Sequence, residues 1–315
     1  MIPFQGGIRL KRYAFLIPLM LIGFVSFAVT VSFWEIPFPE GTGPTAKGIG
    51  GIYNNPAVLS LETNWQFGLM TSLWNSVGDE HYHIVGATLI QPYQYGFAGG
   101  LDILYGQLKD QAGSNTFASF GYAISGLWNR LSWGARIIAG YFDNDPESSV
   151  YGSANLGLMY SVLDNTHILF NFNAPQIVTT KPLVFDINRP ETFNIGAGIL
   201  TANDIGRVYA GMTAYNKNEN PYFGFMFGGG IKMAFLNWDL AFVGKDLFVG
   251  IPIDEMNAVI KASLYLDFEY FAIGVGAQMP LTTYGFSETI LSAFVRATKP
   301  QAVAKAGCCG PMPCN

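Results

Sequence analysis

The chain has 315 residues, of which 50% are hydrophobic, 15% aromatic and only 12% charged, and its formal net charge is −5. Because an average soluble domain carries roughly 25% charged residues, this composition favours a membrane or fibrous protein. Beyond the N-terminus no apolar run reaches the length of about 18 residues typical of a transmembrane helix, which excludes a bundle of such helices. The acidic balance argues against nucleic-acid binding.

Residues 1–28 have the pattern of a secretory signal peptide. Arg9, Lys11 and Arg12 form a basic start, residues 13–25 are almost entirely apolar, and small side chains suit cleavage near Ala28. Removing these three cations from a net charge of −5 leaves −8. An uncleaved single-helix anchor is the alternative. The body of the chain has no cysteine before Cys308, so an exported protein of this kind needs no disulfide framework.

Residues 29–62 precede the first predicted strand and contain the sequence GIGGIYNNPAVL at positions 48–59. This stretch resembles the N-terminal segment of the FadL-like barrel superfamily. That superfamily comprises transporters of long-chain fatty acids and other hydrophobic compounds, together with PorV- and PorQ-like barrels. Its members carry a glycine-rich stretch and an Asn-Pro-Ala-x-Leu motif just before the first strand. Here the motif is Asn55, Pro56, Ala57, Val58 and Leu59.

The resemblance implies that residues 29–62 fold into the barrel lumen as a plug. Pro56 fixes its own backbone and keeps the preceding Asn55 out of a helix. Glycines allow tight turns in a crowded lumen, and they are Gly48, Gly50 and Gly51. Burial in the lumen would shield four large apolar side chains, which are Phe33, Trp34, Ile36 and Phe38. A flexible periplasmic leader is the alternative.

From residue 63 onward the sequence divides into fourteen segments of about 10 to 13 residues, close to the roughly 9 to 11 that a tilted strand needs to cross a bilayer. The segments are 63–75, 81–91, 94–107, 116–128, 131–142, 150–163, 166–173, 192–202, 205–215, 221–233, 236–246, 257–267, 269–280 and 286–297. We therefore predict an all-β fold, a transmembrane antiparallel β-barrel of about 14 strands over residues 63–297. This strand count is also similar to that of the FadL-like superfamily.

Apolar side chains alternate with small or polar ones along these segments, which places the two sets on opposite faces of a sheet. In segment 131–142, Trp133 and Ile137 share one face, and Gly134 and Arg136 share the other. An Arg or Lys that faces lipid at the bilayer midplane costs about 2–4 kcal/mol. We therefore expect the charged positions to face the lumen; they are Asp102, Arg136, Lys232, Asp239 and Lys261.

The predicted connections alternate between long and short. Short turns are expected at 92–93, 129–130, 164–165, 203–204, 234–235 and near Phe268, and longer loops at 76–80, 108–115, 143–149, 174–191, 216–220, 247–256 and 281–285. Outer-membrane barrels have short periplasmic turns and long outer loops. The pattern therefore predicts a bacterial outer-membrane protein with both termini in the periplasm. A soluble β-sandwich is the alternative, but its strands should be shorter.

Two predicted outer loops are unusually apolar, and exposed apolar patches often mark binding sites. They form either a capture site for a hydrophobic ligand or a lid that folds inward or lies at the membrane interface. The residues concerned are Ile177, Val178, Leu183, Val184, Phe185, Leu247, Phe248, Val249 and Ile251.

A polar cluster at the predicted outer rim has three interpretations: a metal site, part of a hydrolase, or a polar rim, which is favoured. Its residues are Asp79, Glu80, His81 and His83. No Ser-His or paired-Asp arrangement is recognisable elsewhere, so we expect no enzyme, no cofactor and no resident metal.

The periplasmic tail 298–315 holds Cys308, Cys309 and Cys314. One disulfide is the favoured state of these thiols in the periplasm, and binding of Cu(I) or zinc is the alternative.

The sequence thus predicts an outer-membrane channel for passive uptake of small hydrophobic molecules, as the FadL-like resemblance implies. Its partners would be outer-membrane lipid and a small hydrophobic ligand, with no nucleic acid. The chain departs from fatty-acid transporters in being shorter and having smaller loops. Two alternatives remain: a PorV-like barrel that docks secreted proteins or a secretion machine, and a general porin or structural outer-membrane protein.

Overall fold

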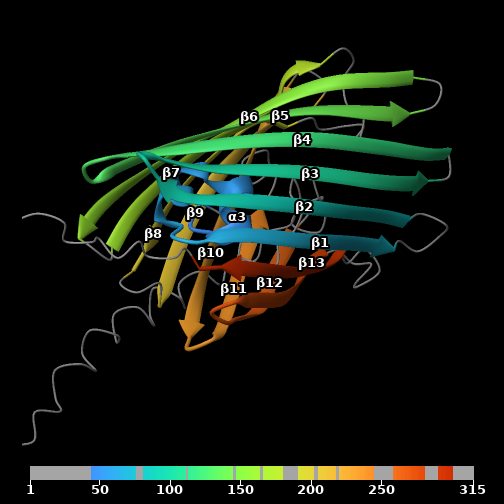
Figure 1. Cartoon of the computed structure of the whole chain (residues 1–315). Helices are drawn as coiled ribbons and strands as arrows, with labels where there is room; N and C mark the ends of the chain where they lie inside the picture. Colours follow the sequence, from blue (N-terminus) through green and yellow to red (C-terminus); the bar gives the residue numbers. More distant parts are fainter. Residues whose placement is uncertain are drawn as a thin grey trace, which may run out of the picture.

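The computed structural model describes residues 44–75, 81–110, 113–144, 147–163, 166–179, 191–201, 205–217, 220–244, 258–280 and 290–300. Each strand pairs in antiparallel fashion with the next along the chain, and the first pairs with the last, so the sheet closes into a barrel (Figure 1). In these ranges, neither helical element is long and apolar enough to cross a membrane.

Within the described residues, two short helical elements precede fourteen strands. They are α3 (Gly48–Asn54), η1 (Pro56–Leu61), β1 (Trp65–Asn75), β2 (His81–Gln94), β3 (Phe97–Asp110), β4 (Gly113–Trp128), β5 (Leu131–Asn144), β6 (Glu147–Leu163), β7 (Thr166–Thr179), β8 (Glu191–Leu200), β9 (Gly206–Lys217), β10 (Asn220–Met233), β11 (Leu236–Gly244), β12 (Ala258–Asp267), β13 (Phe271–Pro280) and β14 (Ile290–Lys299).

The predicted fold class is confirmed, because the fourteen strands overlap the fourteen predicted segments and close into an antiparallel barrel. The predicted end of the barrel is wrong by two residues. β14 continues to Lys299, which pairs with Trp65 at the start of β1. Thr298 and Lys299 therefore belong to the barrel wall and not to the tail.

The turn predicted at Pro92 and Tyr93 is also wrong. β2 continues to Gln94, with a register shift between Gln91 and Gln94. Such a bulge accommodates Pro92, which has no backbone N–H to donate to the ladder. The chain reverses instead at Tyr95 and Gly96, whose φ angles are 52° and 94°. Positive φ at both central residues is the requirement of a tight two-residue type I′ hairpin.

Three loops predicted on the other side of the barrel, 108–115, 143–149 and 216–220, are largely strand. β3 and β4 pair as far as Asp110 and Gly113, and β5–β6 and β9–β10 continue to equally short connections. Polar sequence suggested loops there, but a hairpin that satisfies its own backbone hydrogen bonds extends readily into water. We call this the loop end of the barrel, and the opposite end, with the 95–96 and 129–130 turns, the turn end.

The outward face of the barrel is apolar and the inward face is buried. Ile103, Ile137 and Val275 are 57%, 67% and 56% exposed, whereas their neighbours Asp102 and Arg136 are 1% and 4% exposed. This period-two pattern is the one predicted from the sequence. A continuous apolar outer surface suits lipid rather than water.

Residues 44–64, which we call the inner segment, lie inside the barrel, where Figure 1 shows α3 enclosed by strands. η1 packs against β2–β6, and α3 packs against β1 and β2. Glycines in the wall make room for this contact. A Cβ added at Gly134 would overlap the backbone of Pro56 and Ala57, and one at Gly68 would overlap Ile49. The first part of the predicted plug, residues 29–43, lies outside the described residues.

Candidate functional site

Asn55 organises the inner segment. Its backbone is extended, with φ −150° and ψ 95°, so it separates α3 from η1. Its Nδ2 donates to the carbonyl oxygens of Pro44 and Phe170, each at 3.2 Å, and its Oδ1 accepts from the Ala57 amide at 3.1 Å. Pro56 begins η1, where a missing N–H costs nothing. Asn55 therefore caps η1 and also attaches the segment to β7.

The glycines before Asn55 do not form the tight turns expected from the sequence. Gly48, Gly50 and Gly51 all belong to α3, and of the three only Gly48 has a positive φ, 58°. Glycine is a poor helix former, which is why the sequence suggested turns. Gly51 is instead required for packing, because a Cβ there would overlap Val58 and lie 3.2 Å from the Ala46 carbonyl oxygen.

Side chains of the barrel wall satisfy the carbonyl groups at the end of α3. Asn155 Nδ2 donates to the Tyr53 oxygen at 2.8 Å, and Asn171 Nδ2 donates to the Asn54 oxygen at 2.9 Å. Two serine contacts hold η1 to the wall in the same way, namely Ser125 Oγ to the Ala57 oxygen at 3.2 Å and Ser60 Oγ to Ser132 Oγ at 2.7 Å. The inner segment is therefore bound to the β4–β7 side of the lumen.

A buried ion pair lies directly against α3. Arg136 donates to both carboxylate oxygens of Asp102, from Nε at 3.0 Å and from Nη2 at 2.7 Å. The guanidinium carbon is 4.4 Å from the centroid of the Tyr53 ring, and the Tyr53 hydroxyl is 3.1 Å from Thr88 Oγ1. Burial raises the pKa of Tyr53 far above its usual value, so the phenol stays neutral. A bidentate pair that also stacks on an aromatic ring fixes the position of the segment.

The remaining predicted lumen residues also lie on the inward face. Asp239 accepts from Arg207 Nε at 2.6 Å and from the Tyr209 hydroxyl at 2.8 Å. Lys261 is buried, at 6% exposure. Lys232 lies nearer the turn end and contacts Asp267 at 3.3 Å. Sequence reasoning missed Arg207 and Asp267 as partners, although both alternate with outward apolar residues and could have been found by that signal.

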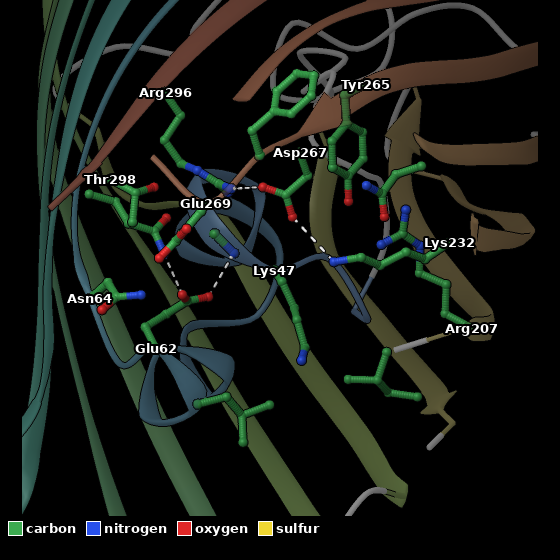
Figure 2. Close-up of a pocket in the computed structure, with 16 residues that line it drawn as sticks. Lys47, Glu62, Asn64, Arg207, Lys232, Tyr265, Asp267, Glu269, Arg296 and Thr298 are labelled. Carbon is green, nitrogen blue, oxygen red and sulfur yellow. Dashed lines mark hydrogen bonds and ion pairs between the residues drawn. The ribbon is translucent and has the colours of Figure 1, made fainter. Parts of the chain in front are cut away.

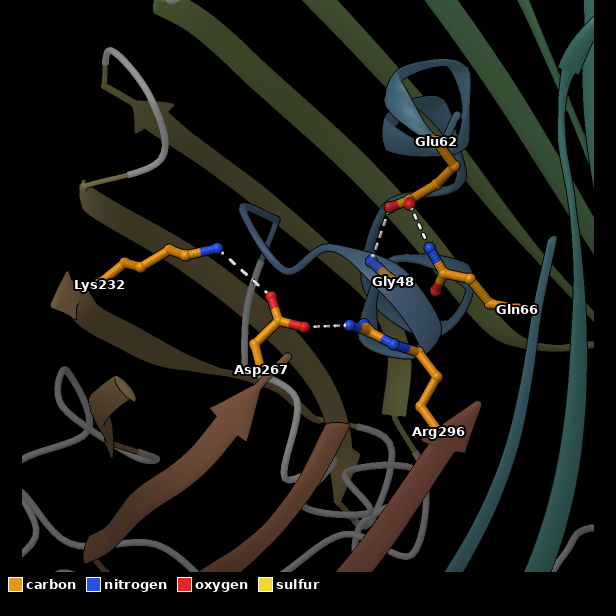
Figure 3. A network of polar contacts seen from close by, with 6 residues as sticks. All are labelled: Gly48, Glu62, Gln66, Lys232, Asp267 and Arg296. Carbon is orange, nitrogen blue, oxygen red and sulfur yellow. Dashed lines mark hydrogen bonds and ion pairs between the residues drawn. The ribbon is translucent and has the colours of Figure 1, made fainter. Parts of the chain in front are cut away.

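Two carboxylates organise the turn end of the lumen (Figure 3). Asp267 accepts from Lys232 and, through its other oxygen, from Arg296 Nη2 at 2.6 Å. Glu62 accepts from the Gly48 amide at 2.9 Å and from Gln66 Nε2. The first carboxylate crosslinks three strands, and the second ties the start of α3 to the start of β1.

Between these groups lies a cavity of about 420 Å³, which we call the turn-end cavity (Figure 2). One side is the inner segment, and the other is formed by residues of β8–β12, β14 and the start of β1. Its charged and amide lining includes Lys47, Glu62, Arg207, Lys232, Asn237, Asp267 and Arg296. The inner segment packs on one side of the lumen and leaves this space on the other.

Towards the loop end, the inward faces become mostly apolar. The buried side chains there are Met70, Ile84, Leu104, Phe117 and Ile138, together with Val243, Val259 and Ile290. Serines, Lys261 and Gln278 interrupt this surface. The lumen thus changes from a mainly apolar half at the loop end to a charged half at the turn end.

The predicted ligand-capture residues fall into two groups. Ile177 and Val178 are not in a loop, because β7 continues to Thr179 and Val178 pairs with Gly152. A run of β-branched residues prolongs a strand, and the predicted loop 174–191 therefore began too early. The other residues, Leu183, Val184, Phe185, Leu247, Phe248, Val249 and Ile251, lie outside the described residues.

The histidines gather no metal site within the ranges that the structure describes. His83 is on the outward face, with Nε2 3.1 Å from Thr71 Oγ1. His81 begins β2, and Asp79 and Glu80 are outside the described ranges, as is the cysteine tail. One contact was missed from the sequence: Ser161 Oγ lies 2.9 Å from His167 Nδ1. The β6–β7 turn makes these two residues cross-strand partners.

No sequence family matches the chain, and no curated protein matches it. Several solved structures, however, are similar to the chain in fold. The Pseudomonas putida toluene transporter TodX has 11% identity and a TM-score of 0.54, over 87% of this chain and 99% of that one. The Ralstonia pickettii toluene transporter TbuX has 12% identity and a TM-score of 0.55, over 84% and 100%. A Pseudomonas aeruginosa FadL homologue has 11% identity and a TM-score of 0.50, over 88% and 100%. The chain therefore has the FadL-like barrel fold.

Proposed function

We propose that this protein lies in the bacterial outer membrane and mediates passive uptake of small hydrophobic molecules. The closed barrel pairs its backbone groups internally, as a lipid environment demands, and its outward face is apolar. The likeness to toluene transporters supports the choice of solute. The observation that carries the proposal is the packing of the inner segment against β1–β8, which leaves the turn-end cavity between the segment and the β9–β14 side of the barrel.

The proposed path begins at the loop end, where the apolar residues around Phe185 and Phe248 capture the solute. Apolar inward side chains then give it a favourable environment in the loop half of the lumen. The solute passes the inner segment on its β9–β14 side and reaches the turn-end cavity. The inner segment acts as a plug that narrows this path, and the concentration gradient drives net movement.

The test is uptake of radiolabelled toluene by Escherichia coli cells that produce the full chain, since an intact outer membrane slows hydrocarbon entry. We expect a rate several-fold above that of cells with empty vector. The variant Phe185→Asp/Phe248→Asp should return uptake to the vector rate. Phe235→Asp is the matched control, because this exposed phenylalanine lies in the turn between β10 and β11 at the other end of the barrel.

Folding is checked for every variant by the change in gel mobility that heating causes in folded barrels. Uptake at the vector rate by a folded wild-type protein would overturn the proposal. Large ion conductance in planar bilayers would favour a general porin, and a secretion complex retained on the purified barrel would favour a docking role.

A further inference from the structure

The turn-end cavity contains buried hydrogen-bond donors that transport of a hydrocarbon would not use. Arg207 and Asn237 are 6% and 3% exposed, and both line the cavity, where Figure 2 labels Arg207. Arg207 Nη2 and Asn237 Nδ2 have no hydrogen-bond partner in the described part of the chain. A buried donor without an acceptor is costly, so an acceptor in the cavity would be bound favourably.

The two donors belong to one patch of the wall. On β10, Gly230 pairs with Arg207 of β9, and Lys232 pairs with Asn237 of β11. The absence of a side chain at Gly230 lets Arg207 cross β10 and reach Asp239 with its Nε at 2.6 Å. This contact and a hydrogen bond with Tyr265 hold the guanidinium in place, and Nη2 is the nitrogen that has no partner among the described residues. Lys232 Nζ completes a set of three donors on neighbouring strands.

The charge of this wall favours one negative charge. Three cations, Arg207, Lys232 and Arg296, share two carboxylates, because Asp267 accepts from both Lys232 and Arg296 and Asp239 accepts from Arg207. One positive charge is therefore in excess on the wall. Lys47 and Glu62 also line the cavity and are both half-buried, so their opposite charges offset each other, and solvent screens the charge of the exposed Glu269.

We propose that the turn-end cavity binds an oxyanion, the carboxylate of a small organic acid, through Asn237 Nδ2, Arg207 Nη2 and Lys232 Nζ. A carboxylate offers two acceptor oxygens to the guanidinium, amide and ammonium donors, and charge-assisted hydrogen bonds of this kind are strong. A neutral hydrocarbon satisfies none of them. The inference adds the anions of small organic acids to the solutes of the path proposed above, and it rests on that function for its biological role.

The test is calorimetric titration of the full chain in detergent with benzoate. We expect saturable binding at one site, which Asn237→Leu weakens about tenfold or more because it removes a donor to a charged group at nearly constant volume. Gln278→Leu is the matched control, since Gln278 is an inward-facing, fully buried amide outside the cavity lining. It should leave the affinity unchanged, and toluene should not compete with benzoate.

Lys232→Met provides the same test should Asn237→Leu fail to fold, because the Lys232 side chain is 34% exposed and tolerates replacement. Absence of benzoate binding to the wild type, or an equal loss in Gln278→Leu, would overturn the inference. Inorganic phosphate that binds as tightly as benzoate, with the same loss in the variant, would overturn the assignment to a carboxylic acid. Toluene uptake by cells without benzoate binding would contradict this inference but not the proposed function. Benzoate binding without any uptake by cells would contradict the proposed function but not this inference.

Discussion

Replacement of Arg136 by methionine tests whether the buried ion pair fixes the inner segment. Arg136→Met leaves the Asp102 carboxylate without its bidentate partner in a site where its side chain is 0% exposed. The carboxylate lies over Gly121, where an added Cβ would overlap it, so it has little room to move towards solvent. Breaking one partner of a buried pair costs about 3–5 kcal/mol. We expect a loss of that size in the free energy of unfolding.

The double variant Asp102→Asn/Arg136→Met separates two effects of the substitution. It leaves no unpaired charge in the lumen, so most of the lost stability should return. The cation over the Tyr53 ring, 4.4 Å from its centroid in the wild type, is absent from both variants. Cation–π stacking is worth about 0.5–2 kcal/mol, so the inner segment should remain loosened in the double variant as well.

Two measurements report the loss of stability and the loosening of the inner segment. Urea unfolding in lipid vesicles, observed by tryptophan fluorescence, reports the stability of the barrel. Maleimide labelling of Ser60→Cys, a nearly isosteric change at a residue only 9% exposed, reports exposure of the inner segment once Cys308, Cys309 and Cys314 are replaced by serine. We expect labelling about fivefold faster in both variants. An unfolding free energy and a labelling rate equal to those of the wild type would refute the role of the pair.

Three further predictions concern packing and the lipid face. Gly134→Ala should speed labelling of Ser60→Cys, because its Cβ would overlap the inner segment, whereas Gly99→Ala, with no atom nearer than 3.7 Å, should not. Asn55→Ala should cost about 1–3 kcal/mol in urea unfolding, because it leaves buried carbonyls unpaired; an unchanged midpoint would contradict this. Ile137→Arg should destabilise the barrel in vesicles by about 2–4 kcal/mol and Ile137→Ser by less; equal losses would argue against lipid contact.

The barrel could be predicted from the sequence because alternation is a local property. Each inward residue is two positions from the next, so a short window assigns Arg136 and Ile137 to opposite faces. The same rule gives no information about height in the lumen. Asp102 and Arg136 meet across β4 because Gly121 pairs with Asp102 and Ala123 pairs with Arg136, and this register depends on the stagger of the whole barrel.

Strand ends were predicted less well because polar residues near a strand end are compatible both with a loop and with a hairpin that extends the barrel. Asp110 and Gly113 read as loop residues, yet they pair across a two-residue connection. The partners of Asn55 were likewise inaccessible, since Phe170 is 115 positions away. Only the motif itself, an asparagine before a proline, indicated that this residue leaves the helical region.

The position of the turn-end cavity follows from which side chains fill the spaces that inward-facing glycines leave in the barrel wall. Fourteen strands enclose more space than their own side chains can fill, so part of the inner segment enters. In β1, β3 and β6 the inner segment itself fills such sites, with Ile49 against Gly68, Ile52 against Gly100 and Asn55 against Gly157. On the β10 and β13 walls neighbouring barrel side chains occupy the gaps, Tyr209 at Gly228 and Tyr265 at Gly274. Pro44 and Thr45 extend these contacts to Gly196 and Gly198 of β8. The segment therefore approaches strands β1–β8 closely, and the space that remains lies against β9–β14.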